Sequence, residues 1–133
     1  LTCVESVRSL LTLDYPRYEI IVINDGSKDG TLPQLTKAFE LHPRPRLPTA
    51  NIATAHVNQV FQSRSSPNLW VIDKANGGKA DALNVGINYC NTPLLCAVDA
   101  YNLLERDALT RIVRPFLEDA RTVAVGGKIR VIN

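Results

Sequence analysis

A glycine turn between an apolar segment and a helix-forming segment constrains this chain most. Residues 69–73 are mostly apolar, residues 76–79 read Asn-Gly-Gly-Lys, and residues 79–89 contain good helix formers. This order predicts a strand, a tight turn and a helix, because glycine accepts backbone angles that other residues avoid. The first turn of a helix attracts anions through its free N–H groups and its dipole, and Lys79 adds a positive charge there. The segment is therefore either a site for an anion such as a diphosphate or a surface loop with a solvated lysine.

Two further apolar segments are each expected to form a strand that ends in a carboxylate. Residues 19–24 lead into Asp25, and residues 94–98 lead into Asp99. Unbroken apolar runs of this length are typical of parallel strands that are buried on both faces. Because ligands of open α/β sheets bind outside the carboxyl ends of the strands, we expect Asp25, Lys79 and Asp99 to line one edge of a sheet.

Several motifs along the chain resemble those of the family-2 glycosyltransferases with the GT-A fold. They lie at residues 9–16, 24–31, 74–84, 98–100 and 126–130. Any one of these motifs is common, but their order and spacing together cover nearly the whole chain. The resemblance is nearest to the processive membrane synthases of β-linked polysaccharides such as poly-N-acetylglucosamine, hyaluronan, chitin and cellulose.

The resemblance and the alternation of expected elements imply an α/β fold with three layers, α/β/α, around a mostly parallel sheet. The length of 133 residues and the hydrophobic content of 45% fit a single domain with a sizeable core. In the family, one more strand precedes the segment that opens this chain, and an acceptor half with the catalytic carboxylate follows its last segment. We therefore expect residues 1–133 to be the donor-binding half of a longer enzyme, truncated at both ends.

The expected elements alternate along the chain. Helices are expected at about residues 1–12, 31–41, 79–89 and 106–117, and strands at about residues 19–24, 55–62, 69–73, 94–98 and 122–133. Asp29 or Thr31 is expected to cap the second helix. The prolines in residues 42–48 argue against regular structure there, and Pro115 should kink or weaken the last helix by ~3 kcal/mol unless packing compensates.

The resemblance assigns roles in donor binding to several polar residues. The aspartate of the motif at residues 24–31 holds the nucleotide in the family, so Asp25 is expected to accept hydrogen bonds from uracil or ribose groups; alternatively, it caps its own turn. Lys79 is expected to meet the diphosphate. Asp81 and Asn84 are candidates for the donor pocket, although side chains on a helix face equally serve as caps or remain solvated.

The motif around Asp99 departs from the family pattern at its last position. The family usually has Asp-x-Asp there, whose carboxylates share a Mg²⁺ or Mn²⁺ ion bound to the nucleotide diphosphate, whereas this chain has Asp99 followed two residues later by Tyr101. A neutral phenol is a poor substitute for a carboxylate. We therefore expect metal binding through Asp99 alone, weak or lost in this chain, and the departure puts catalysis in doubt.

The leading interpretation is an inverting glycosyltransferase that takes a sugar from a nucleotide diphosphate sugar, UDP-linked, and adds it to a growing glycan. No catalytic residue is expected in this chain, because the general base belongs to the acceptor half, and the chain alone is expected to be inactive. The parent protein is expected to carry transmembrane helices and to work at the cytoplasmic face of the cell membrane. The alternatives are a non-catalytic nucleotide-binding domain that has lost its metal carboxylate and an unrelated doubly wound nucleotide binder.

Composition narrows the remaining classes. A formal net charge of +2 with scattered basic residues does not predict a nucleic-acid partner. The sequence has no apolar run near the roughly 20 residues that span a bilayer, so the chain itself is expected to be soluble. Cys3, Cys90 and Cys96 lack the spacing of a metal site and are expected to be buried, reduced thiols.

Overall fold

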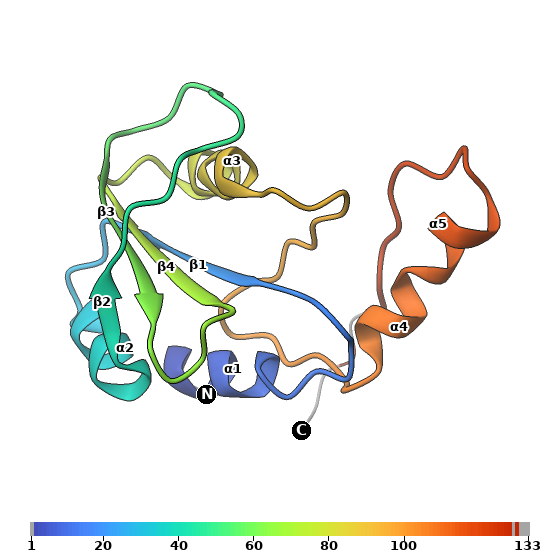
Figure 1. The fold of residues 1–133 in the computed structure, drawn as a ribbon, viewed down its shortest axis with the longest axis horizontal. Helices are drawn as coiled ribbons and strands as arrows, with labels where there is room; N and C mark the ends of the chain where they lie inside the picture. Colours follow the sequence, from blue (N-terminus) through green and yellow to red (C-terminus); the bar gives the residue numbers. More distant parts are fainter. Residues whose placement is uncertain (1, 129, 131–133) are drawn as a thin grey trace.

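Two parallel strands, β1 (Ile20–Asp25) and β4 (Leu69–Lys74), carry the carboxyl ends at which the sequence predicts a site. The computed structural model describes residues 2–128 and 130, and within them four strands form one sheet in the order β1-β4-β3-β2 (Figure 1). β3 (Val57–Ser63) pairs antiparallel with β4, and β2 (Leu41–Pro43) pairs antiparallel with β3. Among the described residues the sheet is therefore mixed, whereas the sequence predicts a mostly parallel one.

Helices cover both faces of the sheet, so the predicted three-layer α/β/α arrangement is present. α1 (Cys3–Leu10) and α2 (Thr31–Phe39) lie on one face, and α3 (Lys79–Tyr89) lies on the other (Figure 1). Successive side chains of a strand point to opposite faces, so β4 contributes to two separate cores. The core under α1 and α2 includes Val7, Leu35, Phe39, Leu69 and Val71, and the core under α3 includes Val60, Ile72 and Val85.

Local capping fixes where the first two helices begin. The Thr2 hydroxyl accepts the Glu5 N–H at 3.1 Å, and the Glu5 carboxylate accepts the Thr2 N–H at 2.7 Å, which is a capping box. α2 follows Gly30, whose φ of 82° lies in the left-handed region. The prediction of Asp29 or Thr31 as the N-cap of α2 is wrong, because Gly30 occupies that position without a side-chain hydrogen bond. Asp29, one residue earlier, accepts the Thr31 N–H through its Oδ1 at 3.1 Å.

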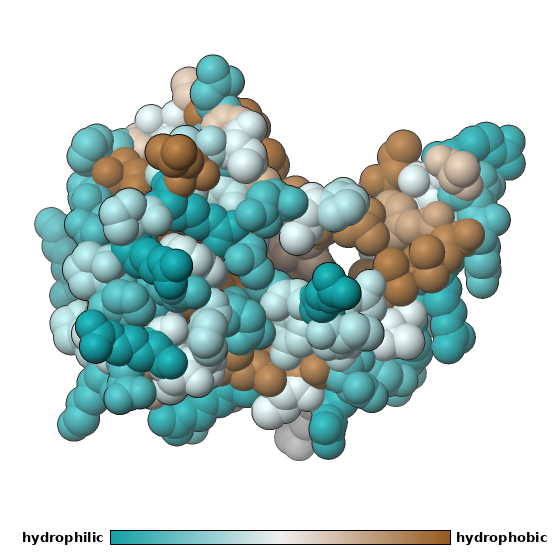
Figure 2. Space-filling model, in the orientation of Figure 1, coloured by the Kyte–Doolittle hydropathy of each residue, from teal (hydrophilic) through white to brown (hydrophobic). Residues whose placement is uncertain are grey.

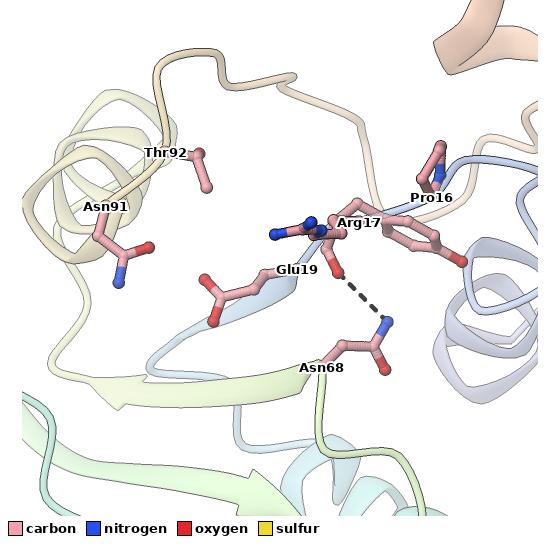
Figure 3. A pocket seen from close by; sticks show the side chains of 7 residues that line it. Pro16, Arg17, Glu19, Asn68, Asn91 and Thr92 are labelled. Carbon is pink, nitrogen blue, oxygen red and sulfur yellow. Dashed lines mark hydrogen bonds between the residues drawn. The ribbon is translucent and has the colours of Figure 1, made fainter.

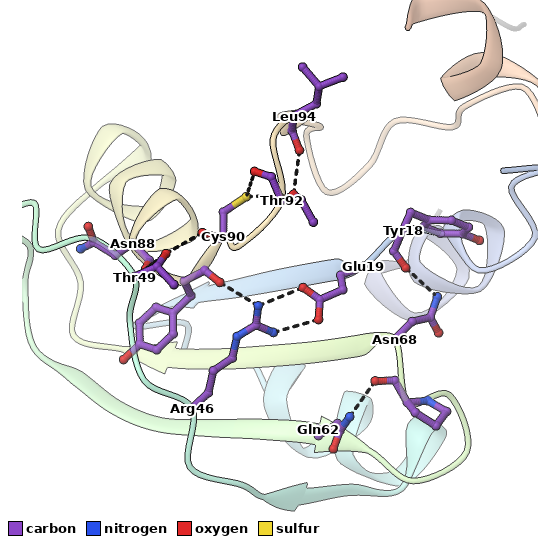
Figure 4. Close-up of polar contacts among 12 residues, drawn as sticks. Tyr18, Glu19, Arg46, Thr49, Gln62, Asn68, Asn88, Cys90, Thr92 and Leu94 are labelled. Carbon is purple, nitrogen blue, oxygen red and sulfur yellow. Dashed lines mark hydrogen bonds and ion pairs between the residues drawn. The ribbon is translucent and has the colours of Figure 1, made fainter. Parts of the chain in front are cut away.

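A segment without regular structure, residues 44–56, connects β2 to β3 and runs along α3 (Figure 1). We call it the strap. The Arg46 guanidinium pairs with the Glu19 carboxylate at 2.9 Å (Figure 4). It also lies over the Trp70 ring, 4.7 Å from its centroid. Asn88 of α3 exchanges two hydrogen bonds with the strap backbone, at 2.8 and 2.9 Å. Residues 44–48, which belong to the strap, are irregular as predicted. The prediction is wrong for residues 42 and 43, which belong to β2.

The strand predicted at residues 94–98 is absent. These residues are apolar, but they are exposed and pair with no strand in the described part of the chain. A strand forms only when a neighbour takes up its backbone hydrogen bonds, and apolar composition alone does not supply that neighbour. Cys96 is therefore exposed rather than buried, while Cys3 and Cys90 are half-buried, and all three are free.

The helix predicted at residues 106–117 is divided in two, α4 (Ala108–Ile112) and α5 (Arg114–Glu118). The break falls next to Pro115, as the missing N–H of proline leads one to expect. Residues 122–128 do not form the predicted last strand, and the rest of that prediction falls on residues outside the described part, apart from residue 130. We call α4, α5 and the described residues after them the outer lobe. Apolar side chains remain on its surface (Figure 2), and Val123 is 91% exposed.

Candidate functional site

The carboxyl ends of β1 and β4 carry a cluster of charged side chains. The two strands pair in register, with Asp25 opposite Lys74. Ile23 and Ile72, two residues earlier in each strand, pack into the core under α3, so the pleat directs Asp25 and Lys74 to that same face. Asp81, in the first turn of α3, meets them there.

Lys74 is the centre of this cluster. Its side chain is fully buried, at 0% exposure, although a lysine at the end of a strand is ordinarily solvated. The ammonium donates to Asp25 Oδ1, to Asp81 Oδ2 at 2.7 Å and to the Ala75 carbonyl at 2.8 Å. All three N–H groups of the ammonium are used, which is the condition under which a charge can be buried at acceptable cost.

The Asp25 carboxylate is also bound by the glycine turn. Its Oδ1 accepts the Gly77 N–H and its Oδ2 accepts the Gly78 N–H, each at 2.9 Å. The sequence predicts that N–H groups of this turn bind an anion, and in the structure the anion that they bind is the Asp25 carboxylate. Gly26 allows this close approach, because a Cβ at that position would lie 2.8 Å from the Asn76 nitrogen.

The contacts in the cluster shift the pKa of each charged member toward its ionised form. The Lys74 hydrogen bond, followed by those of Gly77 and Gly78, lowers the pKa of Asp25. The Lys74 hydrogen bond and the Ala55 N–H of the strap lower the pKa of Asp81. Burial, the largest single influence, pushes the pKa of Lys74 down, but the hydrogen bonds and charges of the two carboxylates outweigh it and raise that pKa. Two carboxylates and one ammonium leave the cluster with one negative charge.

Lys79 and Asp99 lie at the same edge but outside the buried cluster. Their side chains form an ion pair at 2.9 Å and are 77% and 61% exposed. Gly78, the residue before Lys79, donates to Asp25, so the structure brings Asp25, Lys79 and Asp99 to one edge as the sequence predicts. Asn84 is half-buried, one turn beyond Asp81 on α3.

The donor atoms around Asp99 do not fit a divalent cation held by the protein. Hard cations require several oxygen ligands. Asp99 supplies one carboxylate, one of whose oxygens pairs with Lys79, and Tyr101, two residues later, is an exposed neutral phenol. Within the described residues, no three His, Cys, Asp or Glu side chains are grouped so as to hold a metal.

A cavity of about 530 Å³ lies near the opposite ends of the strands (Figure 3). It is lined by residues that precede β1, including Arg17 and Glu19, by Asn68 before β4, and by Asn91 and Thr92 after α3. None of the predicted site residues lines it. The charged cluster therefore remains the candidate site, because ligands of open α/β sheets bind at the carboxyl ends of the strands.

Comparison with known proteins decides the family. The model of the family described as glycosyl transferase family 2 matches residues 1–133. The chain belongs to glycosyl transferase family 2. Its mixed sheet between two helical layers is an α/β architecture of the GT-A type, as the motifs imply. No solved structure matches the chain.

Curated relatives of this family-2 chain include synthases of one polysaccharide. The poly-β-1,6-N-acetyl-D-glucosamine synthase of Staphylococcus epidermidis is 29% identical over 133 residues. The protein of the same name from Staphylococcus aureus strain COL is 30% identical over 132 residues. Each alignment covers 99% of this chain and 26% of the relative, so the chain spans about a quarter of the relatives' length. Within the described residues of this family-2 chain, no helix is both long and apolar enough to cross a membrane.

Sequence reasoning identified Asp25, Lys79 and Asp99 in this family-2 chain but missed Lys74. A lysine that follows an apolar strand is usually read as the exposed end of that strand. The available signal is the register: Trp70, Ile72 and Lys74 share one face by period two, so Lys74 continues a buried row. The sequence makes Asp81, the second partner of Lys74, a candidate for the donor pocket or for a capping role, and in the structure its carboxylate binds Lys74 and the strap.

Proposed function

We propose that this chain binds the nucleotide diphosphate sugar of a glycosyl transfer reaction, with UDP as the nucleotide. Membership in glycosyl transferase family 2 supports the reaction class, and the names of the relatives support a sugar polymer as product. The observation that carries the proposal is the placement of Asp25. It is an ionised acceptor at the carboxyl end of the parallel pair β1 and β4, with a lysine side chain at the same edge.

Each residue of the site has a separate task in this proposal. Asp25 accepts a hydrogen bond from an N–H or O–H group of the nucleotide. Lys79 binds the diphosphate, and to do so it must break its ion pair with Asp99. That exchange is inexpensive, because an exposed ion pair contributes only about 0–1 kcal/mol. Asp81 and Asn84 line the α3 side of the donor site, where Asp81 acts through Lys74 rather than on the donor directly.

The remaining parts of the reaction belong to a longer protein in this proposal. The acceptor glycan, the general base that deprotonates its hydroxyl, inversion at the sugar and transmembrane helices at the cytoplasmic face of the membrane are all assigned to the parent enzyme. Transferase activity is accordingly not expected from residues 1–133 alone. One observation favours a second candidate, a nucleotide-binding domain without catalysis: Tyr101 stands where a second carboxylate would complete a metal site.

Calorimetric titration with UDP tests the assignment of Asp25. Replacing Asp25 by Asn keeps the shape of the side chain, and replacing it by Ala removes the acceptor. We expect the alanine variant to bind UDP less tightly by about 1–3 kcal/mol, the usual loss when a hydrogen-bond partner is left unpaired. Asp119→Ala is the matched control, because this carboxylate pairs with Arg121 in the outer lobe. Equal UDP affinity in the unsubstituted chain and in both Asp25 variants would contradict the role of Asp25 in nucleotide binding.

A titration with and without Mn²⁺ tests the position of Tyr101. In the parent chain we expect UDP affinity to depend little on the cation, because Asp99 alone offers a carboxylate there. Tyr101→Asp should make UDP affinity increase with Mn²⁺ or Mg²⁺, and Tyr101→Phe, which adds no carboxylate, should not. If the aspartate and tyrosine forms respond alike to the cation, residue 101 is not a ligand position.

A further inference from the structure

The free acceptor capacity of Asp25 is small and well defined. Oδ1 accepts two hydrogens, from Lys74 and Gly77, whereas Oδ2 accepts one, from Gly78. A carboxylate oxygen has two lone pairs, so one acceptor position remains, on Oδ2. A quarter of the Asp25 side chain (25%) is exposed, which gives a ligand access to it.

Lys74 connects this carboxylate to α3 and, through Asp81, to the strap. Lys74 extends from β4 to Asp25 on β1 and to Asp81 on α3, and Asp81 in turn accepts the Ala55 N–H of the strap at 3.0 Å. The groups that face Asp25 are Lys74 from β4, Asp81 from α3 and the two N–H groups of the glycine turn. Lys74 is the one cation among them, and it separates two like charges.

We propose that Lys74 is the positioning residue of the donor site: acting through Asp25, it keeps that carboxylate ionised and in one orientation, with the open lone pair of Oδ2 turned toward the nucleotide. This inference rests on the proposed function for the identity of the ligand. Without Lys74, the Asp25 and Asp81 carboxylates would face each other with no charge between them. One of them would then take up a proton more readily, and Asp25 could rotate away from the turn.

A merely structural role for Lys74 leads to a different expectation. If Lys74 only stabilised the fold, any change that weakens the cluster would disturb Asp25 in the same way. If Lys74 sets the charge state of Asp25, then removing Lys74 and removing Asp81 must move the pKa of Asp25 in opposite directions. Loss of the cation raises that pKa, and loss of the neighbouring anion lowers it.

The test is a carboxyl ¹³C NMR titration of Asp25, assigned with Asp25→Asn, in the whole 133-residue chain. We expect Lys74→Met to raise the pKa of Asp25 and to expose the Gly77 and Gly78 amides to faster hydrogen exchange. Asp81→Asn should lower the pKa of Asp25. Lys37→Met, which removes an exposed lysine of α2, is the charge-matched control and should leave the pKa of Asp25 unchanged.

UDP titrations of the same variants connect the pKa to binding. We expect Lys74→Met to weaken UDP binding about tenfold at pH 7.5, the loss of one good hydrogen bond, and further at pH 5. The parent should show no such loss on acidification. If Lys74→Met does not fold, Lys74→Arg, which keeps the cation and should keep the low pKa of Asp25, and Asp81→Asn carry the test.

The results separate this inference from the proposed function. The inference is wrong if Lys74→Met and Asp81→Asn shift the pKa of Asp25 in the same direction, or if neither shifts it. It is also wrong if the Lys74→Met protein binds UDP as the parent does at both pH values. Suppose that the unsubstituted chain binds no UDP while the pKa of Asp25 shifts in the variants as expected. The proposed function would then be wrong, but the effect of Lys74 on the charge of Asp25 would be established.

Discussion

Residues 2–90 and the described residues after them have similar apolar patterns but very different packing. Every buried residue of the described chain lies before residue 91, and both cores of the sheet are formed there. After residue 90 no described residue is buried, and Leu117 and Val123 are largely exposed. The difference shows that an apolar pattern produces a core only where a second surface is available to cover it.

Among the described residues, a few polar contacts join parts of the two regions that are distant in sequence. The Asp14 N–H donates to the Arg106 carbonyl at 2.7 Å, and the Thr110 hydroxyl donates to the Asp14 carbonyl at 3.0 Å. The exposed pair of Lys79 and Asp99 is a third link. β1 is an edge strand among the described residues, so its outer backbone groups are not paired within the sheet. The site therefore takes Asp25, Lys74, Lys79 and Asp81 from the first region and Asp99 from the second.

The largest expected difference in stability is between two phenylalanine variants, one in each region. Phe39→Ala removes a side chain buried between α1, α2 and the sheet and should lower the free energy of unfolding by about 4 kcal/mol. Phe116→Ala, in α5, should lower it by less than about 1 kcal/mol, because that side chain contributes to no buried core. Urea unfolding measures both. Equal losses would mean that the outer lobe is packed as tightly as the sheet.

The next largest difference in stability is expected between variants of two lysines of the site, one buried and one exposed. Lys74→Met should lower the free energy of unfolding by about 3 kcal/mol, because it leaves two carboxylates without their buried cation. Lys79→Met, which breaks an exposed pair, should lower it by less than about 0.5 kcal/mol. Denaturant titrations at neutral pH measure the two values, and a Lys74 effect as small as that of Lys79 would contradict the burial of the ammonium.

The same variant has a defined pH dependence. The pKa values of Asp25 and Asp81 are lowered in the folded chain, so their contribution is complete above the ordinary aspartate pKa of about 3.9 and is lost as the pH falls through the folded values. The pKa of Lys74 is raised, so its contribution is complete below the ordinary lysine pKa of about 10.4 and is lost as the pH rises through the folded value. The difference in stability between the unsubstituted chain and Lys74→Met should therefore be largest from about pH 7 to 9. It should shrink as the pH falls toward about 4, because the variant can protonate one of its two carboxylates.

Two glycines give the smallest contrast. Gly26 has a φ of 71°, and a Cβ there would meet the Asn76 backbone, so Gly26→Ala should cost about 1–2 kcal/mol. A Cβ at Gly126 would meet nothing within 4 Å, so Gly126→Ala should change stability by less than about 0.5 kcal/mol. Gly26→Ala should also weaken UDP binding, since it separates β1 from the turn that holds Asp25. Thermal unfolding followed by calorimetry distinguishes the two variants.

The sequence predicted well where local pattern and packing agree. The expected strands at residues 19–24 and 69–73 match β1 and β4 to within a residue at each end, and the helix expected at residues 79–89 matches α3. The rule for the carboxyl ends of strands correctly predicted Asp25 and Lys79 at one edge, whereas Asp99, whose predicted strand is absent, lies there in an ion pair with Lys79. Their roles in binding stay predictions.

Pattern alone failed where a distant partner decides the outcome. The strand expected at residues 94–98 needs a neighbour that the described chain does not give it. The burial of Lys74 depends on the pairing register with Asp25 and on the position of α3, neither of which is a local property. The antiparallel addition of β3 and β2 likewise depends on the strap, whose course is set by Arg46 and Asn88 and not by its proline content.

The hydrogen bonds from the glycine turn to Asp25 join residues 52 and 53 positions apart in the sequence. Closing a loop of this length costs conformational entropy before any contact within the site repays it, so such contacts form late in folding. During synthesis, Asp25 leaves the ribosome well before the turn that holds it. A partly made chain therefore has the aspartate but no formed acceptor, and the competence to recognise a ligand arises together with the folded sheet.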